Sequence, residues 1–167
     1  SVMTARSSGA SRVIAVDGNK FRLERSLDFG ATDTIDILAG GNTVEQIKAL
    51  SRGGLGVDVA IEAVGLGPAF RTSLDCLRPG GHLANVGVHG RSVELPIDRD
   101  WINNLTLTTG LVNATTAPEL LTQIEQGIIS PEKFVTHHFT FDEFDRAYDT
   151  FSNAADEHAL KVIISNG

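Results

Sequence analysis

The sequence has few of the residues on which small secreted proteins and metal-binding modules depend. Its 167 residues include one cysteine, one tryptophan, one tyrosine and one methionine. The single cysteine, Cys76, excludes an internal disulfide and a cysteine-rich zinc site built from this sequence alone. No run of apolar residues is long enough to span a bilayer. These absences favour a globular protein of the reducing cytoplasm over a secreted or membrane-spanning one.

Positive charge is also scarce. The sequence has 14 lysines and arginines against 21 aspartates and glutamates, which gives a formal net charge of −7. A chain without an overall positive field does not attract anionic polymers, so we expect neither nucleic acid nor a membrane surface as a partner. The length is sufficient for one domain or slightly more, with a sizeable core.

Several common catalytic motifs are missing as well. The sequence has no Gly-x-Ser-x-Gly nucleophile elbow, no P-loop lysine motif, and no His-x-x-x-His or Cys-x-x-Cys spacing. Without a metal-ligand spacing, structural or surface roles are predicted for the five histidines. They are His82, His89, His137, His138 and His158.

An alternation of short apolar segments with amphipathic ones is the main pattern that is present. It predicts strands at 12–16, 32–37, 57–63, 82–86, 93–95 and 105–109, and helices at 2–8, 19–29, 44–51, 68–77 and 100–103. The strand at 12–16 is continuously apolar and is expected to be covered on both faces. A turn is expected at 78–81, and Thr43 is a candidate helix cap. Strands that alternate with helices form right-handed βαβ units, which predicts α/β class with an incomplete Rossmann-type doubly wound parallel sheet.

Asp17 is the sharpest functional signal, because it ends an apolar strand and precedes a helix. In dinucleotide-binding folds such a carboxylate accepts hydrogen bonds from the adenosine ribose, and its charge repels a 2′-phosphate. The following Gly18 and Asn19 offer no arginine to receive that phosphate, so NAD is favoured over NADP. A turn or helix-cap aspartate is the alternative. Arg22, one turn into the helix, lies near the adenosine end or faces solvent.

The glycine-rich turn that cradles the pyrophosphate in this arrangement is missing. It is expected between a first strand and the helix at 2–8, upstream of Ser1. That first strand belongs between the strands at 12–16 and 57–63, so without it both strands leave backbone groups unpaired. We therefore expect that the 167-residue chain does not fold stably as a lone monomer unless another strand fills the gap.

Two glycine-containing pairs follow the strands at 57–63 and 82–86. They are Val64-Gly65 and Gly87-Val88. Ligands of open α/β sheets bind beyond the carboxyl ends of the strands, where glycine lets the backbone approach closely. Ordinary turn chemistry is the alternative. Glu62 lies in a strand that otherwise reads as buried, and a hydrogen-bonded structural role is favoured over a catalytic one.

A series of longer motifs makes the pattern more specific. They are Gly-Ala-Ser-Arg-Val-Ile-Ala-Val-Asp (9–17), Phe-Gly-Ala-Thr-Asp (29–33), Val-Asp-Val-Ala-Ile-Glu-Ala-Val-Gly (57–65), Leu-Arg-Pro-Gly-Gly-His-Leu-Ala-Asn-Val-Gly-Val-His-Gly (77–90), Leu-Thr-Thr-Gly-Leu-Val (107–112), Phe-Ser-Asn-Ala-Ala-Asp (151–156) and Ala-Leu-Lys-Val-Ile-Ile (159–164). With these motifs the chain resembles the zinc-dependent alcohol dehydrogenases of the medium-chain dehydrogenase/reductase superfamily over essentially its whole length.

The resemblance implies NAD-dependent oxidation of an alcohol to an aldehyde or ketone, with zinc as the Lewis acid. It places the zinc ligands and proton-relay residues upstream, so no catalytic or metal-binding residue is assigned in this sequence. It implies cofactor contacts for eight residues: Asp17 and Arg22 at the adenosine ribose, Val64 and Gly65 on the adenosine side, Gly87, Val88 and Leu111 at the nicotinamide end, and Lys161 at the pyrophosphate.

The same resemblance implies a domain division and an assembly. Residues 1–111 are expected to form the NAD-binding domain without its first strand, and 112–167 the C-terminal segment of the catalytic domain, containing a helix at 117–126, a strand at 138–141, a helix at 142–151 and a strand at 161–165. The strand at 105–109 is expected to continue the sheet into a partner subunit of a homodimer or homotetramer. The alternatives are a zinc-free quinone or enone reductase and a non-catalytic fragment.

Overall fold

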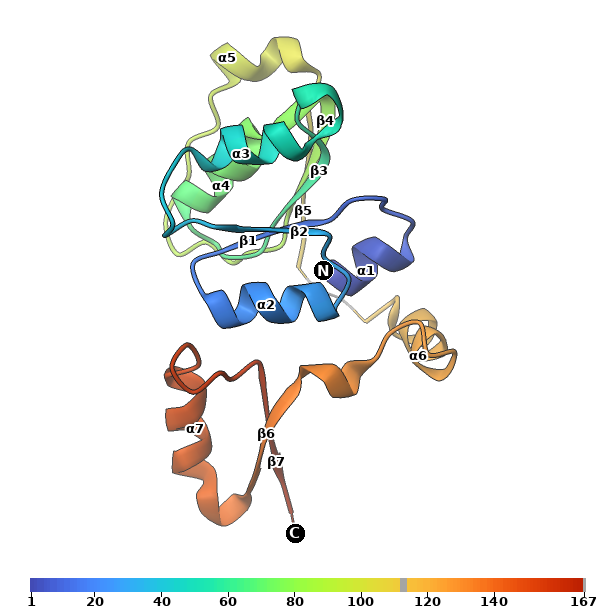
Figure 1. Ribbon diagram of the computed structural model, residues 1–167, viewed down its shortest axis with the longest axis vertical. Coiled ribbons are helices and arrows are strands. Elements are labelled where there is room, and N and C mark those ends of the chain that lie inside the picture. The colour runs from blue at the N-terminus through green and yellow to red at the C-terminus, as the bar shows by residue number, and fades with distance from the viewer. Residues whose placement is uncertain (112–113, 167) are drawn as a thin grey trace. The chain divides into compact units, whose positions relative to one another are not determined.

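The computed structural model describes residues 1–111 and 114–166 as two compact units (Figure 1). The first unit combines Ser1–Leu38 with Thr115–Gly167, and the second is Ala39–Ala114. In chain order the helices and strands are α1 Val2–Ser7, β1 Ile14–Asp17, α2 Lys20–Asp28, β2 Asp33–Asp36, α3 Thr43–Leu50, β3 Val57–Glu62, α4 Gly67–Asp75, β4 Leu77–Asn85, α5 Ile97–Asp100, β5 Thr106–Thr109, α6 Ala117–Glu125, β6 Val135–Thr140, α7 Phe144–Ser152 and β7 Lys161–Ser165.

The second unit is a parallel sheet in the order β3-β4-β5 with two helices against it (Figure 1). Helix α4 packs on β3 and β4, and α3 packs on α4. The interface is apolar, with Phe70, Leu74 and Leu83 each at most 4% exposed. Burial of such side chains contributes about 1.5–3 kcal/mol each. The predicted parallel α/β architecture is confirmed here.

The first unit contains two pairs of parallel strands, β1 with β2 and β6 with β7. Helix α2 packs on the first pair and α7 on the second. Aromatic rings join the parts of the unit that are distant in sequence: Phe29 lies 4.7 Å from Phe134, and Phe21 lies 4.6 Å from His158, between ring centroids. The segment 115–166 therefore packs as part of this unit.

Two predictions about strands were wrong. Residues 78–81 were expected to be a turn, but β4 runs through them because Val57 pairs with Leu77 before the register shifts within β3. Pairing on both sides of this bulge keeps the segment in the sheet. Residues 93–95 do not form a strand. They pair with no other strand in the described part of the chain, and Pro96 follows them.

The predicted burial of β1 and β3 was also wrong. Val16 in β1 is 39% exposed, and Val59 and Ile61 in β3 are 55% and 42% exposed. One face of each strand is covered by a helix, α2 or α4. The opposite face has no such cover among the described elements, so alternate side chains reach solvent. In α3, the cap is Asn42 rather than Thr43, and its Oδ1 accepts hydrogen bonds from Val44 N and Glu45 N.

Each of the strands predicted to flank a missing first strand has an unpaired edge. Within residues 1–111 and 114–166, β1 pairs with β2 only, and β3 pairs with β4 only. An unpaired edge leaves main-chain donors and acceptors without a sheet partner. The prediction that these two strands share a neighbour is compatible with this topology and stays a prediction, as does the domain boundary, which falls beside residues 112–113, outside the described residues.

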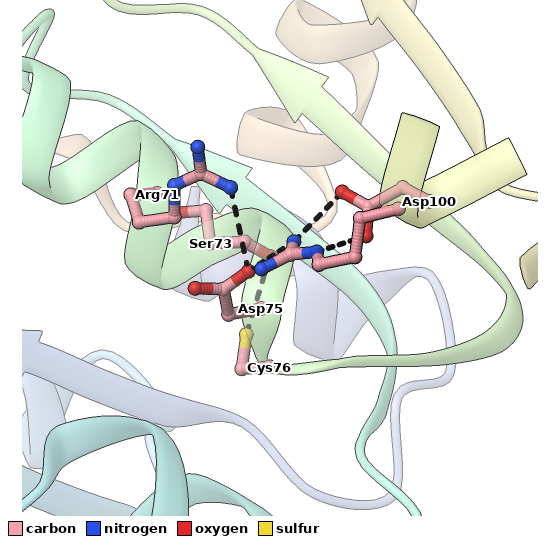
Figure 2. A network of polar contacts seen from close by, with 6 residues as sticks. Arg71, Ser73, Asp75, Cys76 and Asp100 are labelled. Atoms are coloured by element: carbon pink, nitrogen blue, oxygen red, sulfur yellow. Dashed lines mark hydrogen bonds and ion pairs between the residues drawn. The ribbon is translucent and has the colours of Figure 1, made fainter. Parts of the chain in front are cut away.

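A charged network ties α5 to the end of α4 (Figure 2). Arg99 donates to Asp75 Oδ1 at 2.6 Å and to both carboxylate oxygens of Asp100 at 2.6 and 2.8 Å. The hydrogen bonds that Arg99 donates to Asp100 and Asp75 raise the pKa of its guanidinium group, so it remains charged. The neighbouring Cys76 is 3% exposed and donates to Ser73 O, and burial raises the pKa of its thiol to about 11. Its predicted role as a core residue is confirmed by this burial.

Candidate functional site

The carboxyl ends of β3, β4 and β5 lie at one edge of the sheet in the second unit. Glu62 pairs with Asn85, and Asn85 pairs with Thr109, so the three strands end in register. The chain leaves this edge at residues 63–65, 86–88 and 110–111. We call the first two segments, 63–65 and 86–88, the glycine loops. Ligands of open parallel sheets bind beyond this edge.

The two glycine loops touch each other through their glycines. Gly65 has a φ of +81°, and a Cβ placed on it would overlap the carbonyl oxygen of Val88. A Cβ on Gly87 would overlap Gly65 N and Glu62 Oε2. Both positions therefore require glycine. Gly65 requires it for its positive φ and for its contact with Val88, and Gly87 requires it for its contact with Gly65 and Glu62. In this structure the two glycines permit a close approach of the loops to each other. The predicted close approach to a ligand stays a prediction.

Glu62 lies beneath the loops and is 1% exposed. Its Oε1 accepts hydrogen bonds from Val64 N at 2.9 Å and Gly65 N at 2.8 Å, and its carbonyl oxygen accepts from the backbone N–H groups of Val86 and Gly87. One residue at the end of β3 thus holds both loops. The structural role predicted for Glu62 is confirmed by these contacts.

His89 and Asn85 complete this polar cluster. His89 Nε2 lies 2.8 Å from Asn85 Oδ1 and 3.4 Å from Glu62 Oε2. Asn85 Nδ2 donates to the carbonyl oxygen of Gly87 at 3.2 Å. The His89 ring also stands edge-on to Phe70, 6.0 Å away between ring centroids. The sequence analysis did not identify Asn85. Its only signal was a polar amide at the end of an otherwise apolar strand.

Three of the predicted contact residues display their side chains at this edge. Val64 is 64% exposed, Val88 88% and Leu111 92%. Exposed apolar side chains next to a fixed polar backbone suit a partly apolar ligand. The structure therefore brings together Val64, Gly65, Gly87 and Val88, and it places Leu111 just beyond the adjoining strand β5.

Asp17 and Arg22 lie on the first unit, where they form an ion pair. Arg22 Nε is 3.2 Å from Asp17 Oδ2. Asp17 Oδ1 accepts a hydrogen bond from Asn19 N at 2.8 Å, so the turn role considered as an alternative is present. The cap of α2 is Asn19, whose Oδ1 accepts from Arg22 N. The Asp17 side chain is one-third exposed, which leaves it open to a ligand.

Lys161 begins β7 on the first unit and is exposed. Its carbonyl oxygen accepts a hydrogen bond from Thr136 Oγ1 at 3.2 Å, so its backbone is part of the β6–β7 pair. Its proposed contact with a pyrophosphate stays a prediction, as do the ligand contacts of the other seven residues.

The described residues do not supply a metal site. No group of three or more His, Cys, Asp or Glu side chains within 1–111 and 114–166 is placed to hold a metal ion. The histidine at the site, His89, contacts an amide and a carboxylate instead. As for membranes, no helix in the described part of the chain combines the length and hydropathy that a bilayer span requires.

Residues 1–126 match the family of zinc-binding dehydrogenases. The chain belongs to this family. It is similar to an alcohol dehydrogenase of Cupriavidus necator, with 35% identity over 166 residues that cover 96% of this chain and 44% of that protein. It is also similar to an L-threonine 3-dehydrogenase of Shewanella oneidensis, with 30% identity over 94% of this chain and 45% of that protein.

Among solved structures, a zinc-dependent alcohol dehydrogenase from Streptococcus pneumonia in its apo form is 44% identical, with a TM-score of 0.93 over 99% of this chain and 47% of that one. The zinc-binding dehydrogenase chain described here therefore spans a little less than half the length of these relatives. The resemblance found in its sequence motifs is confirmed. Four of the eight predicted cofactor contacts, Val64, Gly65, Gly87 and Val88, lie on the two glycine loops at the sheet edge.

Proposed function

We propose that this chain forms the dinucleotide-binding part of an NAD-dependent, zinc-type alcohol dehydrogenase. The supporting observation is the edge where β3, β4 and β5 end in register and two glycine loops pack against each other. That edge is where open parallel sheets hold nucleotides. A solved relative from Sinorhizobium meliloti, 27% identical with a TM-score of 0.86, is described as bound to NADP, which supports a nicotinamide cofactor in general.

In this proposal the chain binds and orients the cofactor. Asp17 accepts hydrogen bonds from the adenosine ribose, and the backbone of the glycine loops lies along the dinucleotide, with Val88 and Leu111 near the nicotinamide. A nicotinamide cofactor held by these residues would supply hydride transfer, from a small alcohol in one direction and to a carbonyl in the other. The described residues do not fit the zinc ion of this family, because none of their His, Cys, Asp and Glu side chains gather in a group that could hold a metal.

The preference for NAD over NADP rests on charge. Asp17 carries a carboxylate where a 2′-phosphate would approach, and like charges repel. Arg22, the nearest cation, is already paired with that carboxylate. Removing the Asp17 charge is therefore expected to weaken NADH binding and to free Arg22 for a phosphate.

Asp17→Asn is expected to weaken NADH binding by about tenfold to a hundredfold, because a hydrogen bond to a charged group contributes about 1.5–3 kcal/mol. Its preference for NADH over NADPH should fall at the same time. The amide oxygen of asparagine still accepts the bond from Asn19 N, so the turn survives. Fluorescence titrations of the native protein and of Asp17→Asn with NADH and with NADPH measure both effects.

Asp36→Asn is the matched control. Asp36 pairs with Asp17 in the β1–β2 register, and its Oδ1 accepts from Leu38 N at 2.8 Å as Asp17 Oδ1 does from Asn19 N. NADH affinity should change by less than about twofold in this variant. Equal effects of the two substitutions would contradict the ribose role of Asp17. Failure of the native protein to bind either nucleotide would contradict the proposed function.

We also propose that β5 is the contact strand of a homodimer or homotetramer. Within the described residues β5 has no neighbour on its outer edge. Close to it in sequence, Trp101 is 69% exposed, Ile102 65% and Ile97 60%. An open strand edge beside an apolar surface is a site of association.

Ile102→Glu is expected to lower the molar mass of the native assembly, as measured by light scattering, because it buries a charge in the proposed contact. Leu121→Glu on α6 is the control, since Leu121 is similarly exposed, at 59%, but lies on the other unit. A native protein that is monomeric, or an Ile102→Glu assembly of unchanged mass, would exclude this contact.

A further inference from the structure

We propose that His89 is a positioning residue that holds the two glycine loops together as one surface for the dinucleotide, with the second loop at the nicotinamide half. The inference rests on the proposed function for its ligand. Its structural part, the coupling of the loops by His89, does not depend on any ligand.

The hydrogen-bond pattern defines which atom of His89 acts. Asn85 Nδ2 donates to Gly87 O, so Asn85 Oδ1 is the acceptor that faces the ring. A nitrogen 2.8 Å from an acceptor must carry the hydrogen, which places it on Nε2. The same Nε2 is 3.4 Å from Glu62 Oε2. One N–H group therefore faces the end of β4 through Asn85 and the end of β3 through Glu62.

The polar cluster offers Glu62 Oε2 no donor other than the His89 N–H. Glu62 Oε2 is buried and accepts no hydrogen bond among the described residues, so the His89 N–H is the donor that faces it. At 3.4 Å this N–H is a long polar contact rather than a hydrogen bond, and its replacement by an apolar ring edge would leave the buried carboxylate oxygen facing no polar group on the His89 side. Glu62 Oε1 meanwhile holds Val64 N and Gly65 N, so a shift of this carboxylate moves the first glycine loop directly.

The second glycine loop depends on His89 in a different way. Val88 lies between Gly87, whose carbonyl oxygen is held by Asn85, and His89, whose ring packs edge-on to Phe70. The chain is thus fastened on both sides of a residue whose own side chain is 88% exposed. Val88 is therefore held in place on both sides while most of its surface stays open, as a positioned contact for a ligand requires.

The test compares four forms of the native full-length protein. His89→Phe keeps the ring against Phe70 and removes the N–H. His89→Gln keeps a donor at the position of Nε2. His82→Phe is the control, because His82 is an exposed histidine on β4. Each form is titrated with NADH and with ADP-ribose, which lacks the nicotinamide ring.

His89→Phe is expected to weaken NADH binding by about tenfold or more and ADP-ribose binding by clearly less, because ADP-ribose lacks the nicotinamide ring that the second loop would contact. His89→Gln should restore most of the NADH affinity, and His82→Phe should match the native protein. Equal losses for both nucleotides, or a phenylalanine variant as tight as the glutamine one, would overturn the proposal. If His89→Phe does not fold, His89→Asn gives the same contrast, since its shorter amide does not reach the position of Nε2.

Amide hydrogen exchange without ligand tests the coupling separately. In His89→Phe the N–H groups of Val64, Gly65, Val86 and Gly87 are expected to exchange about tenfold faster, in both loops together. Unchanged exchange would refute the coupling even if NADH binds. If the amides exchange faster but the protein binds neither nucleotide, the coupling of the loops by His89 is supported. The proposed function is then wrong, and with it the role of His89 in positioning a nicotinamide cofactor.

Discussion

Gly65→Ala is expected to destabilise the protein by about 2–5 kcal/mol, because it adds a strained backbone angle and an overlap with fixed main chain. The φ of Gly65 is +81°, and the new Cβ would meet the carbonyl oxygen of Val88, which cannot rotate away as a side chain would. The two glycine loops must then separate. We expect NADH binding to fall by at least about tenfold as well, since the ligand surface is formed by both loops.

Gly54→Ala is the control that separates the cost of the backbone angle from the cost of the overlap with Val88. Gly54 has a φ of +71°, but a Cβ there meets nothing within 4 Å. This variant should lose only the roughly 1–2 kcal/mol that an L-residue requires in the left-handed region. Urea unfolding of the native protein and both variants gives the comparison. Equal losses of unfolding free energy in Gly65→Ala and Gly54→Ala would mean that the contact between the loops does not contribute to stability.

Glu62→Ala is expected to destabilise the protein by about 2–5 kcal/mol, because two backbone N–H groups lose their acceptor and each unsatisfied buried donor costs about 1–3 kcal/mol. The donors are Val64 N and Gly65 N. Nucleotide affinity should fall together with stability, since the first glycine loop is no longer held. Chemical denaturation and NADH titration measure the two effects.

Two variants make the Glu62 result specific. Glu62→Gln keeps one oxygen for the loop N–H groups, and we expect it to lose about 1 kcal/mol, because its amide turns a donor toward the His89 N–H. Glu94→Ala, at an exposed glutamate, should change stability by less than about 0.5 kcal/mol. A Glu62→Ala protein as stable as Glu94→Ala would contradict the role of Glu62 as the anchor of the loops.

The candidate site was predictable where its signals are local. Gly65 and Gly87 follow apolar strands, and that placement alone indicated close backbone approach at the carboxyl edge of a parallel sheet. Asn85 was not found, because an amide at a strand end is compatible with many environments. Its importance depends on His89 and on Glu62, which lies 23 residues earlier in the chain. Such a contact depends on the register of β3 against β4, and no local pattern encodes that register.

The secondary structure was likewise predicted correctly only where it depends on local sequence. The alternation of helices and strands was correct because the apolar periodicity of each segment is a local property. The length of β4 was underestimated, because Pro79, Gly80 and Gly81 are turn-forming residues that here lie inside the strand, at the register shift between the paired residues Leu77 and His82. The exposure of Val59 and Ile61 was not predicted, because an apolar sequence pattern is compatible with a strand that is covered on one face or on both.

By itself the sequence determined the parallel α/β class, the membership in a dehydrogenase family, the exclusion of an internal disulfide by its single cysteine, and the burial of Cys76. These follow from composition, periodicity and short motifs, which act over a few residues. Only the tertiary structure decided that Glu62, Asn85 and His89 meet beneath the glycine loops, and that Asp17 pairs with Arg22. Those contacts depend on strand register, on side-chain direction at strand ends and on which helix covers which face, and these are properties of the packed chain rather than of any one segment.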